Sequence, residues 1–137
     1  ATGEMCQNRI VFKQFLENKS LDFCQIDSCR LASLNEIIPI MLIASKLNIP
    51  IIAHAGGVGL CEYVQHLNII NKLIISNNDT YLSEYAESCS EHLINPAKIQ
   101  NGNYITPTES GYSAIIKDES IYKFEFPNGD YWVSVSQ

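Results

Sequence analysis

Short apolar runs alternate with segments of helical periodicity through the first two thirds of this chain, and that alternation limits the folds available to it. Apolar residues recur with helical spacing over 6–18, 33–48 and 58–70, and the runs at 21–27, 49–54 and 80–86 are typical of strands. Strands joined through helices pair in parallel with right-handed crossovers. We therefore expect an α/β fold in which the carboxyl ends of parallel strands share one rim.

Local signals indicate where these elements begin and where the alternation stops. Ser33 followed by Glu36 is typical of a capping box that opens a helix, although Pro39 removes one backbone hydrogen bond within it. After residue 100 the alternation is lost, and we expect 101–137 to be loop and short strand. Turn-forming residues cluster at 101–102, 107–111 and 127–130.

If residues 1–3 are the tail of a first strand, an ionisable residue ends each expected strand. These residues are Glu4, Asp27, His54 and Glu84, and each interval between them suits one strand, one helix and two loops. In a parallel barrel, the carboxyl ends of the strands form the rim at which reactions take place. The spacing therefore predicts that three carboxylates and one imidazole converge on one pocket.

This combination of side chains suits acid–base chemistry. Asp27 could fix the tautomer of His54, which would then act as a general acid or base. Glu4 offers the oxygen atoms that Mg²⁺ prefers, and Glu84 could hydrogen-bond a substrate or its developing negative charge. Glycines follow His54 closely, beginning with Gly56, and they allow the backbone to approach a ligand.

Each of these residues also has an ordinary structural explanation that the sequence leaves open. Asp27 could cap the turn that follows it, and His54 could be a structural histidine. Glu84 could belong to a solvated acidic face with Glu87 and Glu91. It is the register of the four residues, rather than any one of them, that favours a functional site.

Other classes of site are disfavoured by the motifs and the composition. Gly57-x-Gly59 precedes a helix as in a dinucleotide-binding loop, but Glu62 stands at the third glycine position. The net charge of −6 leaves no basic face for nucleic acid, and no apolar run approaches the roughly 20 residues of a membrane span. Five cysteines without metal-type pairing indicate small buried side chains in a reducing, intracellular compartment.

Four stretches make the sequence resemble a known family: ATGEMCQNR, LDFCQIDSCRL, HAGGVGLCEYVQHL and NGNYITPTESGYS. They are similar to the C-terminal part of L-fuconate dehydratases and of related eukaryotic mitochondrial proteins, in the mandelate racemase subgroup of the enolase superfamily. The resemblance runs from residue 1 to about Trp132 and implies the C-terminal part of a (β/α)₇β barrel. Residues 1–100 would then belong to the barrel, and residues 101–137 would be a tail that packs on a capping domain absent from this chain.

The resemblance also implies roles for the residues at the strand ends. Glu4 matches a carboxylate ligand of Mg²⁺, Asp27 and His54 match a catalytic dyad, and Glu84 matches a group that contacts the substrate or its enolate. Substrate contacts are implied for Glu4, His54, Ala55, Gly56 and Glu84. The implied reaction is Mg²⁺-dependent dehydration of a small acid sugar, L-fuconate, to its 2-keto-3-deoxy acid.

The departures from the family pattern bear on what this chain can do alone. The lysine base, two further Mg²⁺ ligands and the capping domain have no counterpart here, and residues 30–33 replace a Gly-Gly of the relatives. We therefore expect little or no activity from the 137 residues by themselves. The full-length enzyme could form homo-oligomers. We expect it to be located in mitochondria or in the cytoplasm. The alternative left open is a truncated form that acts as a non-catalytic binding or assembly module, since half of a barrel exposes two sheet edges.

Overall fold

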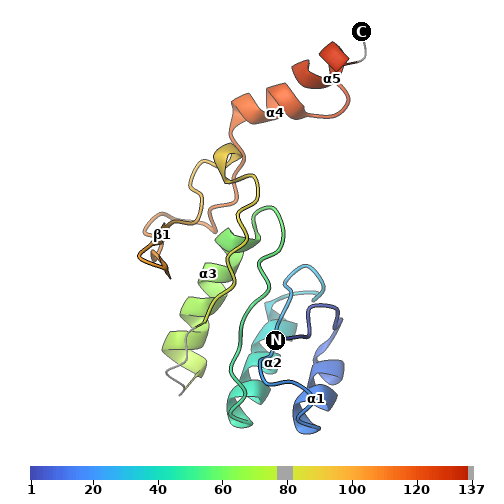
Figure 1. Ribbon diagram of the computed structural model, residues 1–137, viewed down its shortest axis with the longest axis vertical. Coiled ribbons are helices and arrows are strands. Elements are labelled where there is room, and N and C mark those ends of the chain that lie inside the picture. The colour runs from blue at the N-terminus through green and yellow to red at the C-terminus, as the bar shows by residue number, and fades with distance from the viewer. Residues whose placement is uncertain (77–81, 136–137) are drawn as a thin grey trace.

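The computed structural model describes residues 1–76 and 82–135. Its helices are α1 (Arg9–Glu17), α2 (Leu34–Lys46), α3 (Leu60–Ile70), the π-helical η1 (Asn71–Ile75), the 3₁₀ turn η2 (Ser90–His92), α4 (Asp118–Phe124) and α5 (Asp130–Val135). Its strands are β1 (Ile99–Gln100) and β2 (Asn103–Tyr104). Figure 1 shows α1 and α2 side by side at one end of the molecule, α3 in the middle, and α4 with α5 at the other end.

Three segments near the N-terminus pair in parallel, as the alternation predicted. Thr2 bridges Cys24, and Cys24 bridges Ile51, in both cases in parallel. The Ile52 N–H donates to the carbonyl of Cys24 at 3.0 Å, and the His54 N–H donates to the carbonyl of Ile26 at 2.8 Å. The expected strands at 21–27 and 49–54 are therefore neighbours with the predicted direction, although their pairing consists of isolated bridges.

The strand expected at 80–86 is the exception. Residues 80 and 81 lie outside the described residues, and 82–86 form no strand. The hydrogen bonding of the Ala55 N–H explains this difference. In a parallel pair of strands, this N–H would donate to a backbone carbonyl of the neighbouring strand. It donates instead to the side-chain carboxylate of Glu84 at 2.8 Å, so this part of a backbone ladder is not made.

The buried core lies where α1 and α2 pack together and onto the paired segments. Phe12 and Leu16 of α1 are buried there, with Ile37, Ile40, Met41 and Ala44 of α2. Burial of these apolar side chains is the main favourable term in the folding of this part of the chain. Cys24 and Ile26, which precede Asp27, belong to the same core, so the candidate site stands directly on it.

Helix α2 begins as predicted, but its first turn differs from a capping box. The Ser33 hydroxyl accepts a hydrogen bond from the Asn35 N–H at 3.2 Å. Glu36 does not reach back to Ser33; its carboxylate accepts from the Arg9 N–H at 2.9 Å and lies 3.4 Å from the Arg9 guanidinium. Glu36 therefore satisfies the first amide of α1, where a carboxylate also stabilises the helix dipole. Helix α2 runs through Pro39.

The C-terminal part contains more helix than the sequence indicated. The turn at 101–102 is confirmed: Asn101 and Gly102 both have positive φ, as a tight β1–β2 hairpin requires. The expectation of only loop and short strand over 101–137 is wrong for 118–124 and 130–135, which form α4 and α5. The Trp132 indole N–H donates to the carbonyl of Phe124 at 2.9 Å, which holds the two short helices together.

The cysteines fit the expected pattern only in part. Cys24 and Cys61 are buried, whereas Cys29 and Cys89 are exposed, and all are free. No helix within the described ranges is both long and apolar enough to cross a bilayer. The division of the chain at residue 100 stays a prediction.

Candidate active site

The parallel pairing brings the ends of three segments together and with them three of the predicted residues. Glu4 follows the Thr2 bridge, Asp27 follows Cys24 after three residues, and His54 follows Ile51 after three residues. Because the segments run in the same direction, these side chains leave the backbone at the same end. The imidazole of His54 lies between the other two.

His54 contacts one carboxylate through each ring nitrogen. Its Nε2 atom lies 3.3 Å from Glu4 Oε2, and its Nδ1 atom lies 3.6 Å from Asp27 Oδ2. The second separation is too long for a hydrogen bond, so the buried Nδ1 atom has no hydrogen-bond partner within residues 1–76 and 82–135. A movement of a few tenths of an ångström would make this bond, and catalytic hydrogen bonds are often long before a substrate binds.

Asp27 combines the two roles that the sequence left as alternatives. Its Oδ1 atom accepts a hydrogen bond from the Cys29 N–H at 2.7 Å and so caps the turn after the segment. Its Oδ2 atom faces His54. The turn therefore fixes the direction in which the second oxygen points.

Two glycines make room for this arrangement. A Cβ atom on Gly56 would lie 2.8 Å from His54 Nε2, which is closer than real Cβ contacts allow. Gly3 has a φ of +129°, and a Cβ there would lie 2.7 Å from the carbonyl oxygen of Gln25. Gly56 therefore leaves space for the imidazole, and Gly3 lets the chain before Glu4 approach its neighbouring segment.

Glu84 joins the site through the backbone that follows His54. Its Oε2 atom accepts from the Ala55 N–H at 2.8 Å and from the Gln25 side-chain amide at 3.3 Å. Its own carbonyl accepts from the Tyr104 hydroxyl at 2.7 Å. Burial, with a smaller contribution from the neighbouring Cys61 thiol, raises the pKa of Tyr104.

Gln25 and Tyr104 are the residues of this arrangement that sequence reasoning missed. Gln25 lies two residues before Asp27, so both side chains fall on one face of an extended segment, and that spacing was a usable signal. Tyr104 lies in the hairpin, far from the strand ends, and nothing in the sequence connects it to Glu84. The structure brings Glu4, Asp27 and His54 together and places the Glu84 carboxylate on the backbone N–H of Ala55, while their chemical roles stay predictions.

A complete magnesium site is not formed by these residues. Within the described ranges, no group of three or more His, Cys, Asp or Glu side chains is placed to hold a metal ion. One oxygen of Asp27 and one of Glu84 accept backbone N–H groups, and Glu4 is the remaining carboxylate beside His54. Mg²⁺ needs near-octahedral oxygen ligation, which one protein carboxylate does not supply. The donor set present here therefore does not fit Mg²⁺ by itself.

Comparison with known families gives a consistent result. A family model described as "Enolase C-terminal domain-like" matches residues 1–120. The chain is 47% identical over 133 residues to mitochondrial enolase superfamily member 1 of Xenopus laevis, covering 96% of this chain and 30% of that protein. It is 48% identical over 127 residues to L-galactonate dehydratase of Hypocrea jecorina, covering 93% of this chain and 28% of that protein.

Solved structures show the same fold. The crystal structure of human mitochondrial enolase superfamily member 1 matches with a TM-score of 0.90 and 46% identity, over 98% of this chain and 31% of that one. The 3,6-anhydro-D-galactonate cycloisomerase of Zobellia galactanivorans matches with a TM-score of 0.64 at 22% identity, over 83% of this chain and 32% of that one. The chain thus spans about 30% of the length of the relatives that it matches. The expected α/β fold is confirmed.

Proposed function

Because this chain belongs to the enolase C-terminal domain-like family, we propose that it is the part of an acid-sugar dehydratase that carries the acid–base histidine. The observation that carries the proposal is the contact of both ring nitrogens of His54 with carboxylates at the ends of parallel segments. The name of one relative, L-galactonate dehydratase, supports the same class of reaction. The whole reaction would need segments beyond these 137 residues.

The proposed reaction converts L-fuconate to 2-keto-3-deoxy-L-fuconate. The C–H bond next to the carboxylate breaks first, with the proton taken by a base outside this chain. His54 then donates a proton from Nε2 to the 3-hydroxyl group, the C3–O bond breaks as the C2–C3 double bond forms, and water leaves. The resulting enol becomes the keto acid when a proton returns to carbon. Asp27 is a positioning residue in this scheme, since it faces Nδ1 and, once the 3.6 Å separation shortens to a hydrogen bond, would orient the ring so that Nε2 serves the substrate.

The remaining residues would hold the substrate against His54. Glu84 is anchored by the Ala55 N–H, so its carboxyl group is fixed beside the backbone of Ala55 and Gly56, which would line the sugar acid. We propose Glu4 as one ligand of Mg²⁺, with the other oxygen ligands supplied from outside the described residues. The names of several relatives include the word mitochondrial, and we propose the same compartment for this protein.

The test is turnover by the complete enzyme that contains this chain. His54→Ala should lower kcat by at least about 10²-fold, because it removes the group that moves the proton. The matched control is His92→Ala, since His92 contacts Ser120 and Phe124 away from this site, and it should lose no more than a few-fold. Formation of the 2-keto-3-deoxy acid is followed as its semicarbazone.

Two outcomes would contradict the proposal. A loss of only a few-fold in His54→Ala would remove His54 from the mechanism. Robust turnover of L-fuconate with Mg²⁺ by the 137 residues alone would show that no further segment is needed. Comparing kcat/KM for L-fuconate and L-galactonate then decides which sugar acid is preferred.

A further inference from the structure

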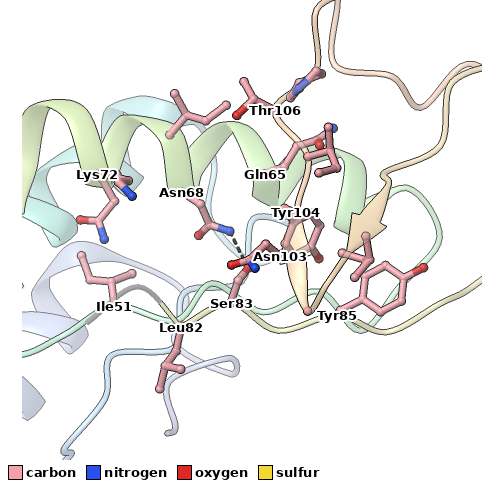
Figure 2. A pocket seen from close by; sticks show the side chains of 16 residues that line it. Ile51, Gln65, Asn68, Lys72, Leu82, Ser83, Tyr85, Asn103, Tyr104 and Thr106 are labelled. Atoms are coloured by element: carbon pink, nitrogen blue, oxygen red, sulfur yellow. Dashed lines mark hydrogen bonds between the residues drawn. The ribbon is translucent and has the colours of Figure 1, made fainter. Parts of the chain in front are cut away.

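The segment 82–86, which carries Glu84, is held in place by side chains because it forms no strand. The Asn68 side-chain amide of α3 donates to the Ser83 hydroxyl, and the Tyr104 hydroxyl donates to the Glu84 carbonyl at 2.7 Å. Figure 2 shows Asn68 reaching across to Ser83, with Tyr104 of the hairpin close by. These two bonds fix the backbone around Glu84, but neither of them involves its carboxylate.

The carboxylate of Glu84 is held by two donors on one oxygen. Its Oε2 atom accepts from the Ala55 N–H at 2.8 Å and from the Gln25 side-chain amide at 3.3 Å. Among the described residues, no donor bonds to Oε1, so this is the oxygen left for a ligand. Donors prefer the plane of the group that accepts them. Two donors from different segments therefore define the plane of the carboxylate, whereas the Ala55 N–H alone would let it turn about a single contact.

Gln25 is itself firmly placed by the parallel pairing. Its N–H donates to the carbonyl of Thr2 at 3.0 Å, and its side chain is half-buried. It lies two residues before Asp27, so the two side chains fall on the same face of the extended segment. Its amide group donates a hydrogen bond without carrying a charge, so it can hold the carboxylate without neutralising it. Gln25 thus connects the segment that carries Asp27 to the segment that carries Glu84.

We propose that Gln25 is a positioning residue for the reaction. Its side-chain amide fixes the plane of the Glu84 carboxylate, so that Oε1 accepts a hydrogen bond from a hydroxyl group of the acid sugar. This role rests on the proposed dehydratase function. Gln25 does not touch the substrate in this scheme and acts through Glu84.

The first test is kcat/KM of the complete enzyme for its preferred acid sugar. Gln25→Met keeps the length of the side chain and removes the donor. It should lower kcat/KM about 5–10-fold, because a bond of 3.3 Å to a charged group is a weaker member of its class. Gln14→Met is the matched control, since Gln14 is exposed on α1, and it should change kcat/KM less than about twofold. Native activity in Gln25→Met would overturn the proposal.

A pH profile separates positioning from a general loss of stability. In Gln25→Glu the introduced carboxyl repels Glu84 when both are ionised, but when protonated it donates to Oε2 in place of the amide. The ratio of its kcat/KM to that of the native enzyme should therefore rise as pH falls from about 8 to about 5. Glu4, Asp27 and His54 titrate in both proteins, so the ratio removes their contribution. A ratio that does not change with pH would overturn the proposal, and it carries the test if Gln25→Met does not fold.

The His54→Ala variant separates the role of Gln25 from the acid–base role of His54. A loss of at least about 10²-fold in His54→Ala, with native activity in Gln25→Met, would leave the proposed function standing and remove Gln25 from it. A loss of only a few-fold in His54→Ala, with the expected loss in Gln25→Met, would refute the proposed function and keep Gln25 as the residue that positions Glu84.

Discussion

The hydrogen bond from the Tyr104 hydroxyl to the Glu84 carbonyl gives a prediction whose size follows from the structure. Tyr104→Phe removes the donor and leaves the partly buried backbone carbonyl of Glu84 without its partner. Leaving a buried acceptor unsatisfied costs about 1–3 kcal/mol. Because Tyr104 is only half buried, we expect the lower part of that range, about 1–2 kcal/mol of unfolding free energy.

Urea unfolding followed by circular dichroism measures this loss. Tyr122→Phe is the matched control, since the side chain of Tyr122 is 75% exposed and its hydroxyl should contribute less than about 0.5 kcal/mol. Equal unfolding free energies of the two variants would refute the reasoning, because the hydrogen bond of the Tyr104 hydroxyl would then contribute no more to stability than an exposed hydroxyl does.

The raised pKa of Tyr104 adds a pH dependence with a definite sign. Below the unfolded-state pKa of about 10, the phenol is neutral in both states, and its contribution to stability is fully present. Above that pH the unfolded chain loses a proton that the folded chain keeps, so stability falls as pH rises. Partial exposure screens the effect, and we expect a loss of about 0.5–1 kcal/mol between pH 10 and 11 in the native chain. Tyr104→Phe should lack this part of the decline; parallel declines in both proteins would contradict the assignment.

Two further predictions concern single positions. In Gly56→Ala the new methyl group would lie 2.8 Å from His54 Nε2, so the imidazole must shift away from residue 56. The His54 ring signals in a long-range ¹H–¹⁵N spectrum should shift while core amides stay, and unchanged ring signals would contradict the contact. Burial raises the pKa of the Cys24 thiol to about 12, whereas Cys29 is exposed. A disulfide reagent should therefore modify Cys29 at once and Cys24 only after unfolding, and equal rates would show that Cys24 is accessible.

The sequence was informative where burial and chain direction act together. The segment 49–54 is apolar nearly throughout, as a strand covered on both faces should be, and the alternation of strands with helices predicted that it runs parallel to 21–27. The same logic placed Asp27 and His54 at the same end, and the structure finds them there. Parallel pairing alone was enough to bring residues 27 positions apart into contact.

Prediction failed where a side chain takes over a bond that the backbone usually makes. Glu84 accepts the Ala55 N–H, so its segment forms no strand, and Glu36 accepts the Arg9 N–H instead of closing a capping box. Neither exchange has a signature in local sequence, because each depends on a residue more than 25 positions away. Tyr104 was missed for the same reason: its contact with Glu84 exists only once the hairpin has folded against that segment.

Helices α4 and α5 show a second limit of local signals. Both are shorter than an isolated helix needs for stability in water. They are held by contacts that only the folded chain supplies, such as the indole of Trp132 on the carbonyl of Phe124. Gly129 contributes as well, since a Cβ there would lie 2.7 Å from the Lys123 carbonyl oxygen.

The central claim is that His54 lies between the carboxylates of Glu4 and Asp27 because three chain segments run in parallel. A crystal structure of the chain measures this most directly. It should show His54 Nε2 near 3.3 Å from Glu4 and Nδ1 facing Asp27. An imidazole turned away from both carboxylates, with Thr2, Cys24 and Ile51 no longer adjacent, would contradict the account.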